Sequence, residues 1–245
     1  MGAHDRVLIL GGTTDARELA ALLVGEGFDV ISSLAGRTRS PAVPAGRLRI
    51  GPFGGSKGLA DYVRSEQIGL IVDATHPFAS QICRHAAAAA SACGIQCIRL
   101  ERAAWMPTDD DNWLDARTPN EAAGCLPKGA CVLMTIGKKD LDSFLARTDL
   151  RGVIRTIEEL DRPLPRNWRL IQARPPFGLD DEERLMRDCG IEWLVSKNAG
   201  GTQTFAKLVA ARRLGIGVIM IARPHKPPVP TAETPAGILQ LIRAV

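Results

Sequence analysis

A cluster of chemically capable residues follows an apolar run at residues 68–72. The stretch Asp73-Ala-Thr-His-Pro-Phe-Ala79 places an acid, a hydroxyl, an imidazole and a proline within five positions. An imidazole can give or take a proton near neutral pH, and a neighbouring carboxylate can hold it or cap the next helix. Of the four histidines, His76 is the one next to a predicted strand end. We therefore expect this stretch to face a ligand.

A second candidate is the turn that follows the apolar run at residues 6–10. Measured against the dinucleotide fingerprint G-x-G-x-x-G/A, Gly11 and Ala16 match the first and last positions, but Thr13 replaces the middle glycine. A tight turn at Gly11 and Gly12, with backbone N–H groups and the Thr13 and Thr14 hydroxyls at a helix start, would bind phosphate. The alternative is a strand-to-helix turn capped by Thr or Asp.

The stretch at residues 32–40 bears on which nucleotide would bind. NAD-binding folds place a carboxylate at the end of the second strand, and this stretch contains none. It offers Arg37 and Arg39, together with the hydroxyls of Ser33, Thr38 and Ser40. These groups suit a 2′-phosphate, so we expect NADP(H); a solvated basic loop is the alternative.

A third candidate lies at residues 194–212. An apolar run leads into Ser196, Lys197 and Asn198, then Gly200-Gly201 and a Thr-rich helix start. This is again a strand, a glycine turn and a helix N-terminus, now with a lysine directed at it. The alternative is a glycine-rich turn carrying a surface lysine.

The elements that must position these residues alternate between short apolar runs and helical patterns, which is typical of parallel α/β units. We predict strands at 6–10, 29–36, 68–74 and 96–100, and helices at 14–27, 58–67 and 79–94. After a Pro- and Asp-rich stretch at 102–120 we predict strands at 130–137, 152–157, 168–174, 191–198 and 216–224, helices at 139–147, 179–190 and 202–215, and a closing helix from 235. The fold class is therefore α/β, with domains at 1–104 and 105–245 that face each other across a ligand-binding cleft.

Composition narrows the function classes. With 45% hydrophobic residues in 245, and neither a secretory leader nor a long apolar span, the sequence predicts a globular protein of the cytoplasm that does not bind membranes. The net charge of +4 is diffuse and only 4% of residues are aromatic, which argues against a nucleic-acid partner. The six cysteines form no C-x-x-C pair, so we expect reduced thiols and no metal site.

Several motifs together resemble one family. "ILGGTTDARELA", "DATHPFA", "TIGKKDL", "PPFGLDDEERLM", "SKNAGGTQTFAKLVAAR" and "VIMIARP" occur in the order and spacing of the precorrin-6A (precorrin-6x) reductases of cobalamin biosynthesis, and the resemblance spans nearly the whole chain. It implies two facing Rossmann-like domains, with NADPH in the cleft between them. It also implies reduction of one double bond of the precorrin-6A macrocycle to give precorrin-6B, and hand-over to other enzymes of the pathway.

The resemblance assigns roles to individual residues. His76 is a candidate proton donor, with a structural or substrate-binding role as the alternative. The substrate carries many carboxylates, so basic groups near strand ends are expected to bind it; for each of them a solvent-exposed charge is the alternative. The expected substrate-binding residues are Phe78, Arg84, Lys138, Arg174 and Arg223. The expected cofactor-binding residues are Gly11, Gly12, Thr13, Thr14, Arg17, Ser33, Gly36, Arg37, Asp73, Ala74, Thr75, Pro77, Lys197, Asn198, Gly200, Gly201 and Thr204.

Two other function classes fit a two-domain α/β pattern. One is a nucleotide-binding or sensor protein without chemistry, which turnover of NADPH with the tetrapyrrole would distinguish. The other is a nucleotide-sugar or phosphate transferase, which needs an acid pair and a metal-binding carboxylate cluster. The only such cluster is "TDDDN" at 108–112, and its position between prolines favours a solvated loop.

Overall fold

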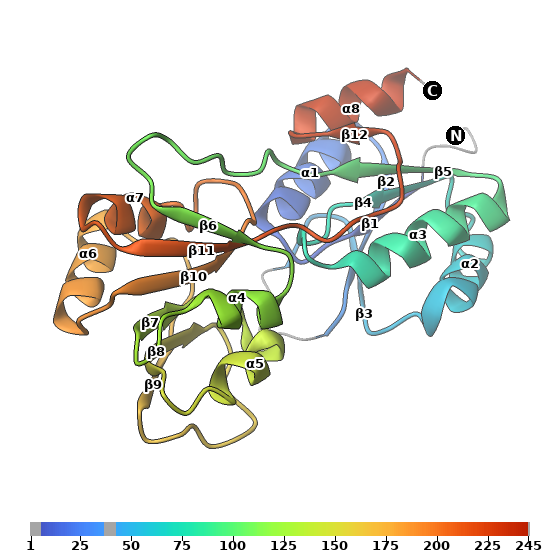
Figure 1. Cartoon of the computed structure of the whole chain (residues 1–245). Coiled ribbons are helices and arrows are strands. Elements are labelled where there is room, and N and C mark those ends of the chain that lie inside the picture. The colour runs from blue at the N-terminus through green and yellow to red at the C-terminus, as the bar shows by residue number, and fades with distance from the viewer. Residues whose placement is uncertain (1–5, 37–42, 245) are drawn as a thin grey trace. The chain divides into compact units, whose positions relative to one another are not determined.

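The chain forms two compact units, each built around one sheet. The structure is a computed structural model and describes residues 6–36 and 43–244. The first unit comprises Met1–Ala103 and Pro224–Val245, and the second comprises Ala104–Arg223. Each contains a six-stranded sheet in which every neighbouring pair is parallel (Figure 1). The predicted α/β class with two Rossmann-like halves is confirmed.

The first sheet has the strand order β12-β5-β4-β1-β2-β3. Its strands are β1 (Arg6–Leu10), β2 (Asp29–Leu34), β3 (Arg47–Ile50), β4 (Leu70–Asp73), β5 (Gln96–Leu100) and β12 (Thr231–Ala232). Its helices are α1 (Thr14–Gly25), α2 (Gly55–Ser65), α3 (Ser80–Cys93) and α8 (Pro235–Arg243). The strand order reverses between β1 and β4, so the loops that follow these two strands border the crevice where open α/β sheets bind ligands.

Side-chain alternation along β1 explains the two layers of helices on this sheet. Val7 and Ile9 pack into a core with α1 and α8, whereas Leu8 and Leu10 pack into a core with α2 and α3. Figure 1 shows α1 with α8, and α2 with α3, as two separate groups of helices. A strand that is covered on both faces is mostly apolar at successive positions, which is why residues 7–10 of β1 form an unbroken apolar run after Arg6.

The second sheet has the order β6-β11-β10-β7-β8-β9 and reverses between β7 and β10. Its strands are β6 (Trp113–Ala116), β7 (Cys131–Met134), β8 (Arg151–Thr156), β9 (Trp168–Gln172), β10 (Trp193–Lys197) and β11 (Gly217–Ile221). Its helices are α4 (Pro119–Cys125), the 3₁₀ turn η1 (Lys138–Asp140), α5 (Asp142–Leu145), α6 (Leu179–Asp188) and α7 (Ala206–Arg213).

The second unit begins one residue before the predicted domain 105–245, but it ends at Arg223 and not at the end of the chain. The segment from Pro224 returns to the first unit, where β12 pairs with β5 and α8 packs on the α1 face. The stretch 102–120, expected as a junction, contributes β6 and the buried Trp105 to the second unit. Both differences arise because pairing between strands far apart in sequence leaves no local pattern.

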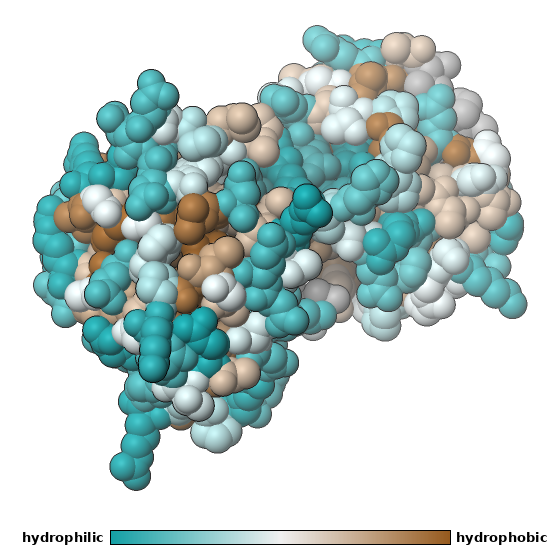
Figure 2. Space-filling view, viewed as in Figure 1, coloured by the Kyte–Doolittle hydropathy of each residue, from teal (hydrophilic) through white to brown (hydrophobic). Residues whose placement is uncertain are grey.

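Two predicted helices also change. The helix expected at 202–215 begins only at Ala206, and the helix expected at 139–147 is reduced to η1 and α5. The strands β3, β6 and β12 and the helix α4 were not predicted. No helix in the described part of the chain combines the length and apolarity needed to span a membrane. Hydrophobic side chains on the face in Figure 2 occur in small groups among hydrophilic ones.

Candidate functional site

The turn after β1 is shaped by its glycines. Gly12 has φ 114°, a conformation that side chains disfavour. A Cβ on Gly11 would lie 3.4 Å from the Cβ of Ala16 and 3.6 Å from Leu34, so the turn packs directly against the start of α1. Close packing of strand end against helix start is the role of the outer fingerprint positions Gly11 and Ala16, whereas the tight turn falls on Gly12 between them.

Thr13 takes the place of the missing middle glycine and joins the two loops of the crevice. Its Oγ1 accepts a hydrogen bond from the N–H of Ala16 at 3.0 Å, which caps α1. The same hydroxyl donates to the carbonyl of Ala74 at 3.0 Å, in the loop after β4. Arg17 donates to the Thr13 carbonyl at 3.3 Å and to the Thr14 hydroxyl at 2.9 Å. The predicted phosphate turn and "DATHPFA" therefore lie side by side.

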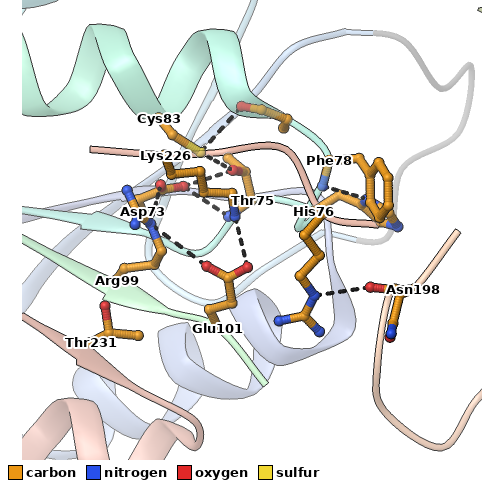
Figure 3. Close-up of polar contacts among 12 residues, drawn as sticks. Asp73, Thr75, His76, Phe78, Cys83, Arg99, Glu101, Asn198, Lys226 and Thr231 are labelled. Carbon is orange, nitrogen blue, oxygen red and sulfur yellow. Dashed lines mark hydrogen bonds and ion pairs between the residues drawn. The ribbon is translucent and has the colours of Figure 1, made fainter. Parts of the chain in front are cut away.

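Asp73 lies beneath this edge rather than on it. Its side chain is 1% exposed, and Oδ1 accepts from the Thr75 hydroxyl at 2.6 Å and from the Thr75 N–H at 3.3 Å (Figure 3). Oδ2 accepts from Arg99 at 3.1 Å. The N-cap of α3 is Ala79, which has no side-chain cap, so Asp73 does not cap this helix. Asp73 shapes the turn that carries Thr75.

A chain of buried charges continues from Asp73. Arg99 also donates to the carbonyl of Pro227 at 3.1 Å and lies 3.9 Å from Glu101. Glu101 pairs in turn with Lys226 at 2.9 Å, and the Lys226 side chain is 7% exposed. The chain ties the ends of β4 and β5 to the segment that returns from the second unit (Figure 3). Near this chain, burial raises the pKa of the Cys83 thiol to about 11, and the negative charge of Asp73 contributes to the rise.

His76 is exposed at the tip of the turn, and Pro77 beside it is buried. Its Nδ1 accepts a hydrogen bond from the backbone N–H of Phe78 at 3.2 Å, and the two rings lie 5.9 Å apart. An imidazole that accepts at Nδ1 carries its proton on Nε2. While Nδ1 accepts this bond, Nε2 is the ring nitrogen that can donate a hydrogen bond to a ligand.

The residues expected to contact the adenosine ribose lie at the end of β2, beside the end of β3. Ser33 is buried and its carbonyl accepts from the N–H of Gly11 at 3.0 Å, and Gly36 follows β2. Arg37, the expected 2′-phosphate ligand, lies outside the described residues. Arg49 on β3 brings a guanidinium to within 3.4 Å of the Ser33 hydroxyl.

The turn after β10 in the second unit is clamped to the chain around Trp105. Asn198 uses its whole amide there: Oδ1 accepts from the Trp105 N–H at 2.8 Å, and Nδ2 donates to the Trp105 carbonyl at 2.9 Å. The indole of Trp105 donates to the carbonyl of Gly201 at 2.8 Å, and Arg223 donates to the carbonyl of Asn198 at 2.9 Å. Asn198 therefore positions the turn formed by Gly200 and Gly201.

The lysine expected to point at a helix N-terminus makes a different contact. Lys197 pairs with Asp140 of η1, and Gly201 is separated from α7 by the residues 202–205, including Thr204. A second lysine was not predicted: Lys207 is 4% exposed and donates to the Thr135 hydroxyl at 3.1 Å. Burial lowers the pKa of Lys207 to about 7, with a further contribution from Arg155.

The expected substrate-binding residues lie on separate elements. Arg84 is exposed on α3, Lys138 pairs with Asp161 at 2.6 Å, and Arg174 pairs with Glu158 at 3.0 Å. In the second unit, Arg223 lines an open hollow of about 530 Å³ at the carboxyl ends of β6, β10 and β11. The hollow is also lined by Ala104, Asp115, Ala116, Arg117, Glu121, Asn198, Met220 and Ala222.

Sequence reasoning missed the charged residues that support the site. Arg99 interrupts the apolar strand "QCIRL", and a charge inside a buried strand indicates a partner that the sequence does not name. Lys226 and Lys207 gave no such signal, because one follows the last long strand and the other lies within the helix expected at 202–215, where a lysine is ordinary.

Comparison with known proteins assigns the chain to a family. The model of the family described as "Precorrin-6x reductase CbiJ/CobK" matches residues 6–243. A precorrin-6A reductase of Rhodococcus erythropolis is 49% identical over 91% of this chain and 91% of its own length, and one of Sinorhizobium sp is 43% identical over 92% and 88%.

A solved structure titled "CobK precorrin-6A reductase" superposes with a TM-score of 0.92 and is 37% identical in sequence. The superposition covers 98% of this chain and 96% of that one. These relatives are all reductases, which gives the binding-only alternative no support. The chain therefore belongs to the precorrin-6x reductase CbiJ/CobK family of oxidoreductases.

Proposed function

We propose that this protein reduces one double bond of the precorrin-6A macrocycle with NADPH, giving precorrin-6B in cobalamin biosynthesis. Family membership supports the reaction, because both named relatives are precorrin-6A reductases. The observation that carries the nucleotide part is the Thr13–Ala74 hydrogen bond, which joins a glycine turn and "DATHPFA" at the crevice of the first sheet.

The residues at this crevice fit a dinucleotide phosphate. Gly11 and Gly12 keep side chains away from the turn, and the first N–H groups of α1 lack helical partners. Thr14 and Arg17 add a hydroxyl and a cation at the same helix start. Ser33 and Gly36 would lie along the adenosine ribose, and Ala74, Thr75 and Pro77 along the nicotinamide end. NADPH, when bound, would supply the hydride.

The chain's own contribution near the reacting atoms comes from the turn at residues 74–78. His76 is exposed and, with Nδ1 bonded to the Phe78 N–H, offers Nε2 as a donor, so we assign it a binding contact to the nicotinamide or the macrocycle. A proton for the reduced macrocycle would then come from water. Phe78, 5.9 Å from the His76 ring, offers an apolar face for the macrocycle.

The second unit provides cationic groups for a polycarboxylate substrate. Arg223 and Arg117 line the hollow at the carboxyl ends of β6 and β11, and a guanidinium fits a carboxylate fork. Asp115 and Glu121 line the same hollow, so its charge is mixed. It would therefore accept at most one carboxylate side chain of the macrocycle. We retain Lys197, Gly200, Gly201 and Thr204 as expected cofactor contacts, with Asn198 as their positioning residue.

The reaction is tested by its stoichiometry. Purified protein with precorrin-6A should oxidise one NADPH for each macrocycle reduced, measured by NADPH absorbance and by mass spectrometry of the product, with no flavin or metal added. A stoichiometric requirement for a flavin or a metal, or NADPH oxidation without macrocycle reduction, would rule the proposal out.

A further inference from the structure

Arg49 lies at the carboxyl end of β3 with its positive charge uncompensated. Its Nη1 donates to the Ser33 hydroxyl at 3.4 Å and to the Gly51 carbonyl at 2.6 Å, and its Nη2 donates to the Pro52 carbonyl at 2.9 Å. These acceptors are all neutral, and among the described residues no carboxylate pairs with Arg49 within ion-pair distance.

Two aromatic rings hold the guanidinium in place. It lies 3.8 Å above the centre of the Phe53 ring and 5.0 Å from that of Tyr62, and the two rings themselves meet edge to face at 5.3 Å. Cation–π contact and the two carbonyl bonds fix the side chain before any ligand arrives. Little side-chain entropy would be lost when Arg49 pairs with an anion.

Arg47, two residues earlier on the same strand, shows the ordinary arrangement. It pairs with Asp29 at 3.2 Å and with Glu66 at 3.3 Å, near the amino end of the sheet. Asp29 also pairs with Arg6 at 2.5 Å, so the acids near these strands gather at the amino end. Of the two arginines on β3, the one at the ligand-binding edge is the one without an acid.

We propose that Arg49 is a specificity-determining residue for the 2′-phosphate of the cofactor. Ser33 is the partner of Arg49 in the β2–β3 register and lies one residue before the end of β2, the strand whose end meets the adenosine ribose in dinucleotide folds. A fixed guanidinium there forms a charge-assisted hydrogen bond with a 2′-phosphate. It adds little to the binding of a 2′-hydroxyl, which is neutral and can hydrogen-bond to water instead. The inference rests on the proposed use of NADPH and names the chain's own group that selects it.

The test compares Arg49→Gln with Arg47→Gln in the full chain. Glutamine at position 49 can still donate to the Gly51 carbonyl but carries no charge, and Arg49→Lys keeps a charge without the fork. The probes are NADPH, NADH, adenosine 2′,5′-bisphosphate and 5′-AMP, titrated by calorimetry. Thermal unfolding of each variant checks that it is folded.

Arg49→Gln should weaken the binding of NADPH and of the bisphosphate by at least about tenfold, because one charge-assisted pair is lost. The affinities for NADH and 5′-AMP should change by less than about twofold. Arg49→Lys should fall between, and Arg47→Gln should match the wild type. Equal losses for all four probes would show that Arg49 only supports its loop, and unchanged NADPH binding would overturn the inference. Failure of NADPH to reduce precorrin-6A would instead refute the proposed function, since the bisphosphate and 5′-AMP report on Arg49 without the reaction.

Discussion

Thr13 stands where dinucleotide folds place their second glycine, and its side chain does two things that a glycine cannot. It caps α1 through Ala16 and donates to Ala74 in the loop after β4. A glycine at this position lets the backbone approach a pyrophosphate closely, whereas the threonine fixes the distance between two loops. The departure from the fingerprint therefore couples the phosphate turn to the turn that carries Thr75 and His76.

His76 gives a prediction at the same scale. His76→Ala should lower kcat by less than the roughly hundredfold expected for loss of an essential general acid, because water can supply the proton in place of the exposed imidazole. His76→Asn, which can keep the bond from the Phe78 N–H, should lose less than His76→Ala. Steady-state kinetics across pH decide the matter: a larger fall, with one limb of the pH profile missing and NADPH binding intact, would make His76 the acid.

The lowered pKa of Lys207 leads us to expect that the free energy of unfolding depends on pH. Its pKa falls from 10.5 to about 7 in the folded protein, mainly through burial, and returns to its ordinary value on unfolding. Between these values the unfolded chain binds one more proton than the folded one, so this group makes the protein more stable as pH rises from about 7 to about 10, by up to about 1.4 kcal/mol per pH unit.

Urea unfolding of the wild type and of Lys207→Met at pH 7, 8.5 and 9.5 measures this contribution. The wild type should gain stability relative to Lys207→Met as pH rises, since the titrations of other groups cancel in the difference. A difference that does not change with pH would mean that Lys207 stays charged when buried.

The ends of β4 and β5 depend on their buried ion pair. Arg99→Met leaves the carboxylate of Asp73 buried without its cation, and loss of one partner of such a pair destabilises by about 3–5 kcal/mol. The exposed pair Arg64–Asp61 on α2 is the matched control, and Arg64→Met should cost about 1 kcal/mol or less.

Denaturant unfolding separates these cases. The double variant Asp73→Asn with Arg99→Met should lose less than the sum of the single losses, because neither charge is then stranded. If Arg99→Met is no more destabilising than Arg64→Met, the pair does not hold the turn.

The central strands could be predicted from their apolar runs, and the loops that follow them could be predicted from their glycines. The run at residues 6–10 is buried on both faces and matches β1 to the residue. By contrast, β3 is an exposed edge strand whose sequence "RLRI" alternates charge with apolar side chains, and it was missed together with Arg49. Position 73 was recognised as special, but its partner Arg99 lies 26 residues away, and no local pattern joins them.

The division of the whole chain also depends on distant pairing. Residues 224–245 follow the last strand of the second sheet, so proximity in sequence placed them in the second domain, yet they complete the first sheet and its α1 face. Ile238 and Leu239 are 0% and 7% exposed there. The first unit therefore needs both ends of the chain.

Truncation after Arg223 tests this dependence. Removing α8 exposes the core that holds Ile238 and Leu239, and burial of two such side chains is worth about 3–6 kcal/mol. Hydrogen exchange should show lost protection in β1, β4 and β5, with protection in β7, β10 and β11 retained. Equal loss in both units, or in neither, would show that the two units do not divide the stability of the chain in this way.

The return of the chain has a consequence for synthesis on the ribosome. The second unit has its complete sheet once Ile221 has emerged, because all six of its strands are contiguous in the chain. The first unit has made five strands by Leu100 but receives its last one only with Thr231 and Ala232. Domains fold as units during translation. The unit that is translated first is therefore completed last, and its nascent β5 edge stays open while the whole of the second unit is being made.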